Sequence, residues 1–434
     1  MKATIIGGGI IGLSAAWYLH ETGWQVTVLE RGDLRDNCSF GNMGYLSPSH
    51  FVPLAAPGMV EKGIAWMFNA KSPFYVRPSL SPALFRWGWR FMRSSTAAHV
   101  ARSARPLVDL LLLSRDLFAR WADAGDMDFQ MERKGCIMFY KTSRTEHEEL
   151  DNARMAEKLG LKVEVLDAEA ACAIEPDLQP DVRGGVWFKD DAHLYPNALM
   201  QQLPALLEKR GVRIVRQAEV TGFEKKNGKI TGIRYQSGQG AEQEGIAEQD
   251  LVVLAAGSWS PKIAGMAGES MLLMPGKGYS TTLDQPVKTL RHPCILLEAK
   301  VALTPWAGRL RIGSTMEIGA VNDRILFPRV KGLLEAVPRY LPGYQDDPQF
   351  RKLTDWADLN NKLREKIWFG FRPVSADGMP YIGFAKNTPN LIIATGHAML
   401  GLSLGAGTGK VVAELASGQA TSVPIEAFDP GRFG

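Results

Sequence analysis

Three glycines near the N-terminus, at positions 7, 9 and 12, have the spacing of a phosphate-binding turn, and an acid follows at position 30. Gly7 permits a tight turn, Gly9 lets backbone N–H groups approach a pyrophosphate, and Gly12 lets a helix pack closely on a strand, because none has a Cβ atom. The carboxylate of Glu30 is placed to accept hydrogen bonds from a ribose diol, and its charge disfavours a 2′-phosphate there. This spacing predicts a dinucleotide bound at a helix N-terminus, where unpaired amides and the helix dipole favour an anion.

A strand, a helix and a second strand must position these residues. We expect the first strand over residues 3–6, the helix over about 10–21 and the second strand ending at Glu30. The same stretch, ATIIGGGIIGLSAAWYL after Met1 and Lys2, could instead be a secretory signal. A signal would leave the later residues unrelated to the glycines, whereas residues 25–30 supply the β-branched run and the acid of a dinucleotide unit. We therefore interpret the stretch as a phosphate loop and expect the chain to keep its N-terminus.

The composition excludes several classes of protein. The chain has 434 residues, 45% hydrophobic and 22% charged, so we expect a sizeable core in about two or three domains. A net charge of +4 is small for this length and argues against a nucleic-acid partner. The four cysteines include no CxxC pair, which argues against a disulfide framework or a zinc site, and we expect no metal. No apolar run has the length of a membrane span, so a cytoplasmic protein, soluble or peripheral, is expected.

The middle of the chain indicates a nucleotide-binding domain built from separate pieces. A helical block through about Asp126, a strand in GCIMFY and a helix around residues 146–159 differ from the N-terminal unit. Residues 197–235 predict a helix and three strands, with a hairpin turn at Asn227-Gly228. The buried strand in DLVVLAAGSWSP then indicates that the nucleotide-binding sheet resumes after an insertion. A simple nicotinamide dehydrogenase would finish that sheet in one continuous stretch.

The last segment repeats the pattern of a strand, a glycine turn and a helix. It occupies residues 390–418, and we expect its helix to begin near Gly401. The positive end of this helix could face another part of the ligand. Alternatively, the strand and the helix merely close the sheet.

The motifs together resemble the D-amino-acid oxidase/glycine oxidase superfamily of FAD-dependent amine oxidoreductases. The resemblance rests on the glycine fingerprint, AAGSWS, and the block GFRP, DGMPYIG and ATGH. Within the superfamily, SFGNMGYLSP, AAPGM, PGKGYS and GHAMLGLSLGAGTGK are most similar to the small-subunit type of bacterial D-amino-acid dehydrogenase. The resemblance implies an α/β fold with a glutathione-reductase-type FAD-binding Rossmann domain and a discontinuous α+β substrate domain centred on an antiparallel sheet. We expect the first domain over residues 1–75, 193–262 and 373–434, and the second over 76–192 and 263–372.

The resemblance also implies which residues hold FAD. The ADP half is assigned to Gly7, Gly9, Ile10, Ile11, Gly12, Glu30 and Arg31; the middle and the flavin edge to Ser39, Asn42, Met43 and Gly44; the adenine to Val220; the pyrophosphate turn to Ala256 and Gly257; and the isoalloxazine ring to Gly396, His397, Leu400, Gly401 and Leu402. The FRPVSADGMPYIG block has no cysteine where sarcosine-oxidase relatives carry a flavin-linking thiol, so we expect FAD to be non-covalent.

Catalysis in such a site depends more on the orientation of the substrate than on acid–base chemistry, because the flavin accepts a hydride from the substrate's Cα. Arg372 matches the family's substrate arginine, and its planar fork can grip a carboxylate, although it could instead form an interdomain salt bridge. Tyr279 is a candidate donor to the substrate or a core tyrosine, and His397 a candidate for proton transfer or for packing beside the flavin. His50 stands where relatives that prefer D-alanine have a different stretch, so it is a substrate-binding candidate. Lys277 is interpreted as a surface lysine.

The predicted reaction is oxidation of a small or cyclic D-amino acid, such as D-alanine, D-proline or 4-hydroxy-D-proline, with electrons passed to a quinone or another acceptor. The alternatives are an oxygen-using oxidase of amino acids or N-methyl amino acids, and a flavin-binding subunit without turnover. The stretch LFRWGWRFMR, residues 84–93, alternates aromatic residues with arginine, as an interfacial helix would. It is therefore a candidate contact with the inner membrane, or an ordinary helix with its tryptophans in the core. Homo- and hetero-oligomers both stay open.

Overall fold

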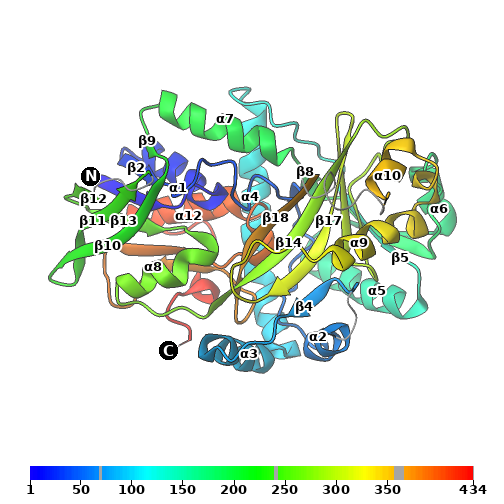
Figure 1. The fold of residues 1–434 in the computed structure, drawn as a ribbon, viewed down its shortest axis with the longest axis horizontal. Coiled ribbons are helices and arrows are strands. Elements are labelled where there is room, and N and C mark those ends of the chain that lie inside the picture. The colour runs from blue at the N-terminus through cyan, green and yellow to red at the C-terminus, as the bar shows by residue number, and fades with distance from the viewer. Residues whose placement is uncertain (68–70, 239–242, 356–365, 434) are drawn as a thin grey trace.

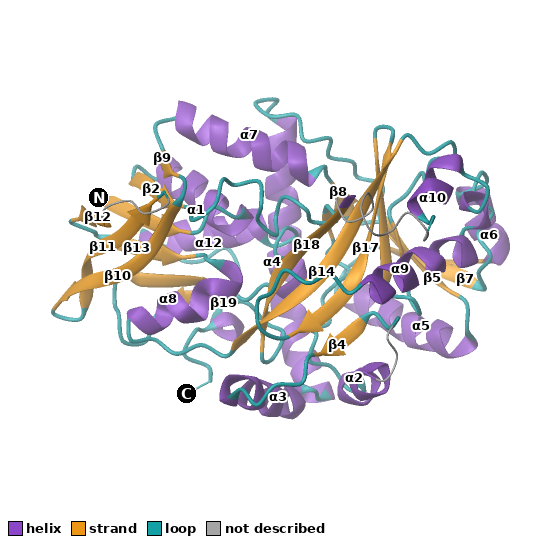
Figure 2. Cartoon of the chain, in the orientation of Figure 1, coloured by secondary structure: helices purple, strands orange, loops and turns teal. Residues whose placement is uncertain are grey.

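The computed structural model describes residues 1–67, 71–238, 243–355 and 366–433. Two sheets dominate it, one in each half of the molecule (Figures 1 and 2). The first sheet has the strand order β19-β20-β13-β1-β2-β9. Its strands are β1 (Lys2–Ile6), β2 (Gln25–Leu29), β9 (Arg213–Val215), β13 (Leu251–Leu254), β19 (Tyr381–Phe384) and β20 (Leu391–Thr395).

The first sheet is buried on both faces, which explains its apolar strands. Alternate residues of β1 enter different clusters: Ala3 and Ile5 pack with α1 (Ile10–Glu21), α4 (Ala97–Asp123), α7 (Pro196–Lys209) and α12 (Gly405–Ala416), whereas Ile6 packs on the opposite face. That opposite face is covered by α8 (Ser260–Met266) and a small antiparallel sheet of β10 (Ala218–Lys226), β11 (Lys229–Ser237) and β12 (Gln243–Ala247). β1 is parallel to both β2 and β13.

The second sheet has the order β18-β14-β17-β16-β15-β5-β7-β6, and β4 also pairs with β17. Most neighbours are antiparallel, but β15 is parallel to β5 and β4 to β17. Its strands are β4 (Phe74–Val76), β5 (Cys136–Tyr140), β6 (Val163–Asp167), β7 (Gly184–Phe188), β14 (Leu273–Asp284), β15 (Cys294–Leu296), β16 (Val301–Trp306), β17 (Arg309–Ile318) and β18 (Ile367–Ser375). One face packs against α6 (Ala168–Ile174), α9 (Phe327–Tyr340) and α10 (Pro348–Leu353).

The remaining elements lie around the two sheets. A short ribbon joins β3 (Tyr45–Leu46) to β8 (Ala192–His193). The helix α5 (Ser143–Lys158) contacts β5, β6 and β7, and α2 (Met59–Met67) and α3 (Pro82–Ser94) lie at one edge of the molecule near β4 (Figure 1). Within the described ranges, no helix is both long and apolar enough to span a bilayer.

These elements confirm the predicted α/β architecture with mixed sheets, and the strand–turn–helix unit at residues 2–29 has the expected bounds within one residue. The hairpin turn at Asn227 and Gly228 joins β10 to β11, as predicted. The predicted start of the last helix near Gly401 is wrong. α12 begins at Gly405, because the 3-10 turn Ala398–Leu400 comes first.

α3 separates the two tryptophans that the sequence analysis treated together. Trp87 is buried, and its Nε1 donates to Val374 O at 2.9 Å. Trp89 is 59% exposed and shares the outer face with the exposed Phe85 and Met92. The helix period of 3.6 residues places positions 85, 89 and 92 on one side and 87 and 91 on the other.

We expect Gly409→Ala to destabilise the protein, because a Cβ at Gly409 of α12 would overlap the backbone of Ser14 in α1. Overpacking of this kind costs about 1–3 kcal/mol, so the thermal midpoint followed by circular dichroism should fall. Gly88→Ala in α3 is the matched control, since a Cβ there meets open space. Equal midpoints for Gly409→Ala and the wild type would contradict the close helix packing.

Candidate active site

A large cavity lies between the two sheets. Its volume is about 1470 Å³, above the range of about 300–1,000 Å³ usual for one drug-sized ligand. One wall consists of the ends of β1 and β20 and the start of α1, and the other consists of β14, β17 and β18. The loop that follows β3 and the turn Ala398–Leu400 complete the lining. The space is large enough for a dinucleotide together with a small second molecule.

The glycine turn at α1 brings backbone close to this cavity. Gly7 has a φ of 113°, and a Cβ there would overlap the backbone oxygen of Ala255. A Cβ at Gly12 would overlap Gly7 O, so the helix can approach the turn only with glycine at position 12. Gly9 precedes the helix and provides no side-chain cap, which leaves the α1 N-terminus accessible to a ligand. Ser39 Oγ accepts from Ile10 N at 3.0 Å and joins the next loop to this turn.

Glu30 follows β2 directly and is 8% exposed. Its Oε2 accepts from Gly8 N at 2.6 Å and its Oε1 from Gly32 N at 2.7 Å. Each oxygen keeps a second lone pair, so the carboxylate can also accept from a ribose diol at the cavity wall. The glycine turn and this acceptor fit the adenosine half of FAD.

The loop after β2 runs along the middle of the cavity. Asn42 and Met43 line it, and Arg311 of β17 donates from Nη1 to Asn42 O and from Nη2 to Asn197 Oδ1, both at 2.6 Å. Burial lowers the pKa of Arg311 to about 10, so the side chain remains a cation at neutral pH. The nucleotide-binding loop is thereby tied to the second sheet.

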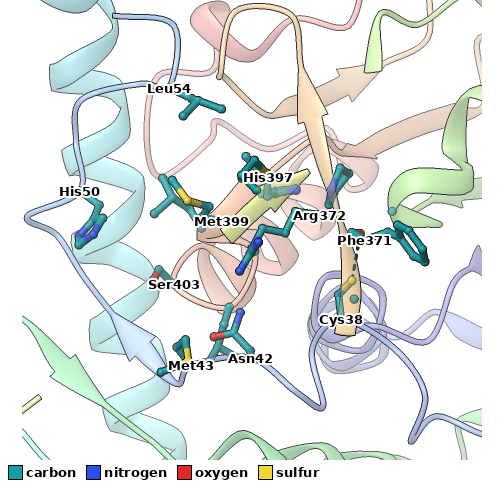
Figure 3. Close-up of a pocket in the computed structure, with 18 of the residues that line it drawn as sticks. Cys38, Asn42, Met43, His50, Leu54, Phe371, Arg372, His397, Met399 and Ser403 are labelled. Atoms are coloured by element: carbon teal, nitrogen blue, oxygen red, sulfur yellow. Dashed lines mark hydrogen bonds between the residues drawn. The ribbon is translucent and has the colours of Figure 1, made fainter. Parts of the chain in front are cut away.

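Arg372, on β18, points toward the middle of the cavity (Figure 3). Its Nη1 donates to Thr315 O at 2.7 Å, and Thr315 has a φ of 75°. No carboxylate among the described residues forms an ion pair with Arg372, so the interdomain salt bridge is not formed there. Burial lowers the pKa of the guanidinium, but arginine keeps its charge in proteins. A half-buried cation that faces this cavity favours an anion as its ligand, and a carboxylate matches its fork.

Gly278 of β14 creates the space for this guanidinium. Gly276 pairs with Arg372 across the strands, and a Cβ at Gly278 would overlap the Arg372 guanidinium. The small residues of PGKGYS therefore let the arginine lie flat against its neighbour strand.

His397 and Tyr279 also line the cavity, but their polar atoms are partly engaged elsewhere. His397 Nε2 lies 3.1 Å from Thr408 Oγ1, and burial lowers the pKa of His397 to about 3, so its ring is neutral. The Tyr279 hydroxyl donates to Glu317 Oε1 at 2.7 Å and accepts from Leu326 N at 3.1 Å. Because its hydrogen is already used, Tyr279 presents its ring, not a donor, to the cavity.

The interpretation of Lys277 as a surface residue is wrong. It is 1% exposed on β14, and its Nζ donates to Asn322 Oδ1 and Arg324 O, both at 2.6 Å. Because side chains alternate along β14, Lys277 lies on the other face of the sheet from Gly276 and Gly278. The charge of Lys277 did not suggest that this side chain would be buried.

Most of the predicted site residues line this one cavity. They are Gly7, Gly9, Ile10, Ile11, Glu30, Arg31, Ser39, Asn42, Met43, His50, Val220, Ala256, Gly257, Tyr279, Arg372, His397, Leu400, Gly401 and Leu402. Three predicted glycines do not line it and instead shape the backbone: Gly12 under the turn, Gly44 where a Cβ would overlap Leu194 O, and Gly396 where it would meet Tyr381.

Sequence reasoning missed several residues. Cys38, whose thiol donates to Phe371 O at 2.9 Å, and Thr315, which orients Arg372, are brought to the cavity only by strand pairing. Ser49 lines it as well and is hydrogen-bonded to Asp191, far along the chain. The glycine spacing of PGKGYS beside FRP is the one signal that could have indicated the Arg372 cradle.

Comparison with known proteins identifies the family of this chain. Residues 2–415 match the family described as DAO, FAD dependent oxidoreductase. A D-amino acid dehydrogenase of Methylobacterium sp. (strain 4-46) is 30% identical over 448 aligned positions, covering 100% of this chain and 99% of that relative. Among solved structures, glycine oxidase from Geobacillus kaustophilus has a TM-score of 0.76 at 22% identity, covering 100% of this chain and 98% of the other. L-proline dehydrogenase from P. horikoshii has a TM-score of 0.73 at 20% identity, covering 100% and 97%.

The family match spans nearly the whole chain, and the two solved structures share the fold. The glycine turn, Glu30 and the cavity are the features that an FAD-binding member requires. The chain belongs to the DAO family of FAD-dependent oxidoreductases.

Proposed function

We propose that the protein is an FAD-dependent D-amino-acid dehydrogenase that acts on small or cyclic D-amino acids. The observation that carries the proposal is Arg372, a half-buried cation that faces the cavity without an anionic partner among the described residues. The name of the Methylobacterium relative supports the D-amino acid as substrate. When bound, FAD supplies the acceptor for the hydride that leaves Cα of the substrate.

The residues of this chain then position the substrate. Arg372 binds the carboxylate through its outer N–H groups, while Thr315 O holds Nη1 in place. Because the fork fixes the carboxylate, it also fixes the direction of the Cα–H bond. His397, neutral through burial, adds no charge beside the reacting carbon. The apolar side chains Met43, Leu402 and Phe371 exclude water from the cavity.

The strands of each sheet come from several separate segments of the chain, and these segments support the division into two domains that we propose. Residues 1–75, 193–262 and 373–434 would form the FAD-binding domain and 76–192 and 263–372 the substrate domain. The electron acceptor in this proposal is a quinone or another carrier, reached from the cytoplasm at the inner membrane.

Substrate should bleach the flavin. Under anaerobic conditions we expect D-amino acids, tested beside their L-isomers, proline, 4-hydroxyproline and sarcosine, to reduce the visible flavin absorbance, with slow recovery in air. Rapid recovery would indicate an oxidase. Bleaching by sarcosine alone would indicate an N-methyl-amino-acid oxidase, and no bleaching would indicate a subunit without turnover.

Replacement of Arg372 should damage substrate binding while FAD stays bound. Arg372→Leu removes charge-assisted hydrogen bonds worth about 1.5–3 kcal/mol each, so kcat/KM should fall at least about 100-fold. Gly278→Ala should also lower kcat/KM, because its methyl group displaces the guanidinium. Gly265→Ala, where a Cβ meets nothing within 4 Å, is the control. Unchanged turnover in Arg372→Leu would contradict the assignment of Arg372 as the residue that binds the substrate carboxylate.

The outer face of α3 is proposed as the membrane contact. Trp89, Phe85 and the 92% exposed Leu80 are apolar side chains beside Arg86 and Arg93. Because burying an aromatic side chain is worth about 1.5–3 kcal/mol, Trp89→Glu should lower affinity for phosphatidylglycerol vesicles about 10-fold or more in a sedimentation assay. Val287→Glu, at another exposed apolar position, is the control. A wild-type protein that does not sediment with vesicles would contradict the proposal.

A further inference from the structure

Three residues behind and beside the cavity form a hydrogen-bonded chain. Ser49 Oγ donates to Asp191 Oδ2 at 2.6 Å, and Ser49 N donates to Asp191 Oδ1 at 3.0 Å. His50 Nδ1 lies 3.1 Å from Ser49 Oγ. Asp191 is 2% exposed and precedes β8, which pairs with β3, so the ribbon β3–β8 brings these residues together.

The chain fixes the tautomer of His50. The single hydroxyl hydrogen of Ser49 is used on Asp191, so Ser49 Oγ can only accept from His50 Nδ1–H. Burial and the charge of Lys300 lower the pKa of His50 to about 4, so the ring carries one proton, on Nδ1. His50 Nε2 is therefore an acceptor with a lone pair available.

His50 lies across the cavity from Arg372, on the loop that follows β3 (Figure 3). The carboxylate and the amine of an amino acid are attached to the same carbon, so both stay at the Arg372 end. The part of the substrate that reaches the His50 side is its side chain.

The surroundings of His50 are polar, unlike the rest of the lining near Arg372. Glu149 and Asn152 of α5 line the same part of the cavity, and Asn152 Nδ2 donates to Glu149 Oε2 at 3.1 Å. Lys300 lies close enough to act on both His50 and Glu149. An alkyl side chain at this position would leave the acceptor His50 Nε2 without a donor, at a cost in affinity.

We propose that His50 is a specificity-determining residue that accepts a hydrogen bond through Nε2 from a hydroxyl on the substrate's side chain, and that Ser49 and Asp191 are positioning residues that hold its ring in the accepting tautomer. The preferred substrates are then hydroxylated amino acids. This inference rests on the proposed function, because it places the carboxylate on Arg372.

The test compares matched substrates that differ by one hydroxyl group: D-serine with D-alanine, and cis-4-hydroxy-D-proline with D-proline. It is run with the FAD-loaded enzyme at pH 8.5, above the pKa of Asp191, which burial raises to about 7. In the wild type we expect kcat/KM to favour the hydroxylated member of at least one pair by about 10-fold or more. His50→Leu should remove this preference, mainly through KM of the hydroxylated member, and leave the other member nearly unchanged.

The conservative variants separate positioning from general damage. His50→Gln keeps an acceptor oxygen and should retain part of the preference. Ser49→Ala breaks the chain and should reduce the preference, whereas Ser49→Thr keeps the hydroxyl and should restore it. Ser114→Ala, in α4 and outside the cavity lining, removes a buried hydroxyl without a partner among the described residues and should leave the preference unchanged.

Two results would overturn the inference. A wild type with no preference in either pair means that His50 receives no side-chain donor. An equal loss for both members in His50→Leu means that His50 serves the amine or the fold instead. Failure of the proposed function is distinguishable, because then no D-amino acid, hydroxylated or not, would bleach the flavin.

Discussion

A partly desolvated guanidinium without a carboxylate partner among the described residues is costly, and the second sheet is organised around that cost at Arg372. β14 supplies Gly278, which has no side chain to occupy the place of the guanidinium, and β17 supplies the carbonyl of Thr315. One carbonyl does not neutralise a cation, so the proposed binding site for an anion would already be formed in the free protein. Such preorganisation reduces the ordering that a substrate must undergo, which increases affinity per contact.

The two sheets contribute different kinds of chemical group to the same cavity. The first sheet provides backbone groups at a helix N-terminus and a glycine turn, together with one side chain, the carboxylate of Glu30. The second sheet provides side chains on rigid antiparallel strands, among them Arg372 and Arg311. Arg311 connects the two, because it donates to the loop that carries Asn42. A shift of either sheet would therefore move residues on both sides of the cavity.

Local features could be predicted from the sequence, whereas long-range burial could not. The turn at Gly7, the helix after it and the position of Glu30 after β2 depend on residues within one βαβ unit, where spacing alone is informative. Lys277 looked exposed because its charge suggested solvent, but its burial depends on Asn322 and Arg324 beyond the next strands. The bond from Ser49 to Asp191 crosses 142 positions and leaves no pattern in the letters. Trp87 and Trp89 differ in exposure only because α3 turns Trp87 toward β18 and Trp89 away from it.

The pairing of β1 has a consequence for how the chain is made. β1 is synthesised long before two strands of its sheet: Ala3 pairs with Leu251 of β13, and β20 joins β13 only after residue 390. Parallel pairs between such distant strands form slowly, because loop closure must precede any gain from contact. The apolar strand β1 has its neighbour β2 early, but β1 and α1 lack β13 and α12 for most of translation and are exposed to misassociation. Because β20 and α12 complete this half of the molecule, the chain is expected to acquire its nucleotide only after residues 391–416 have been synthesised.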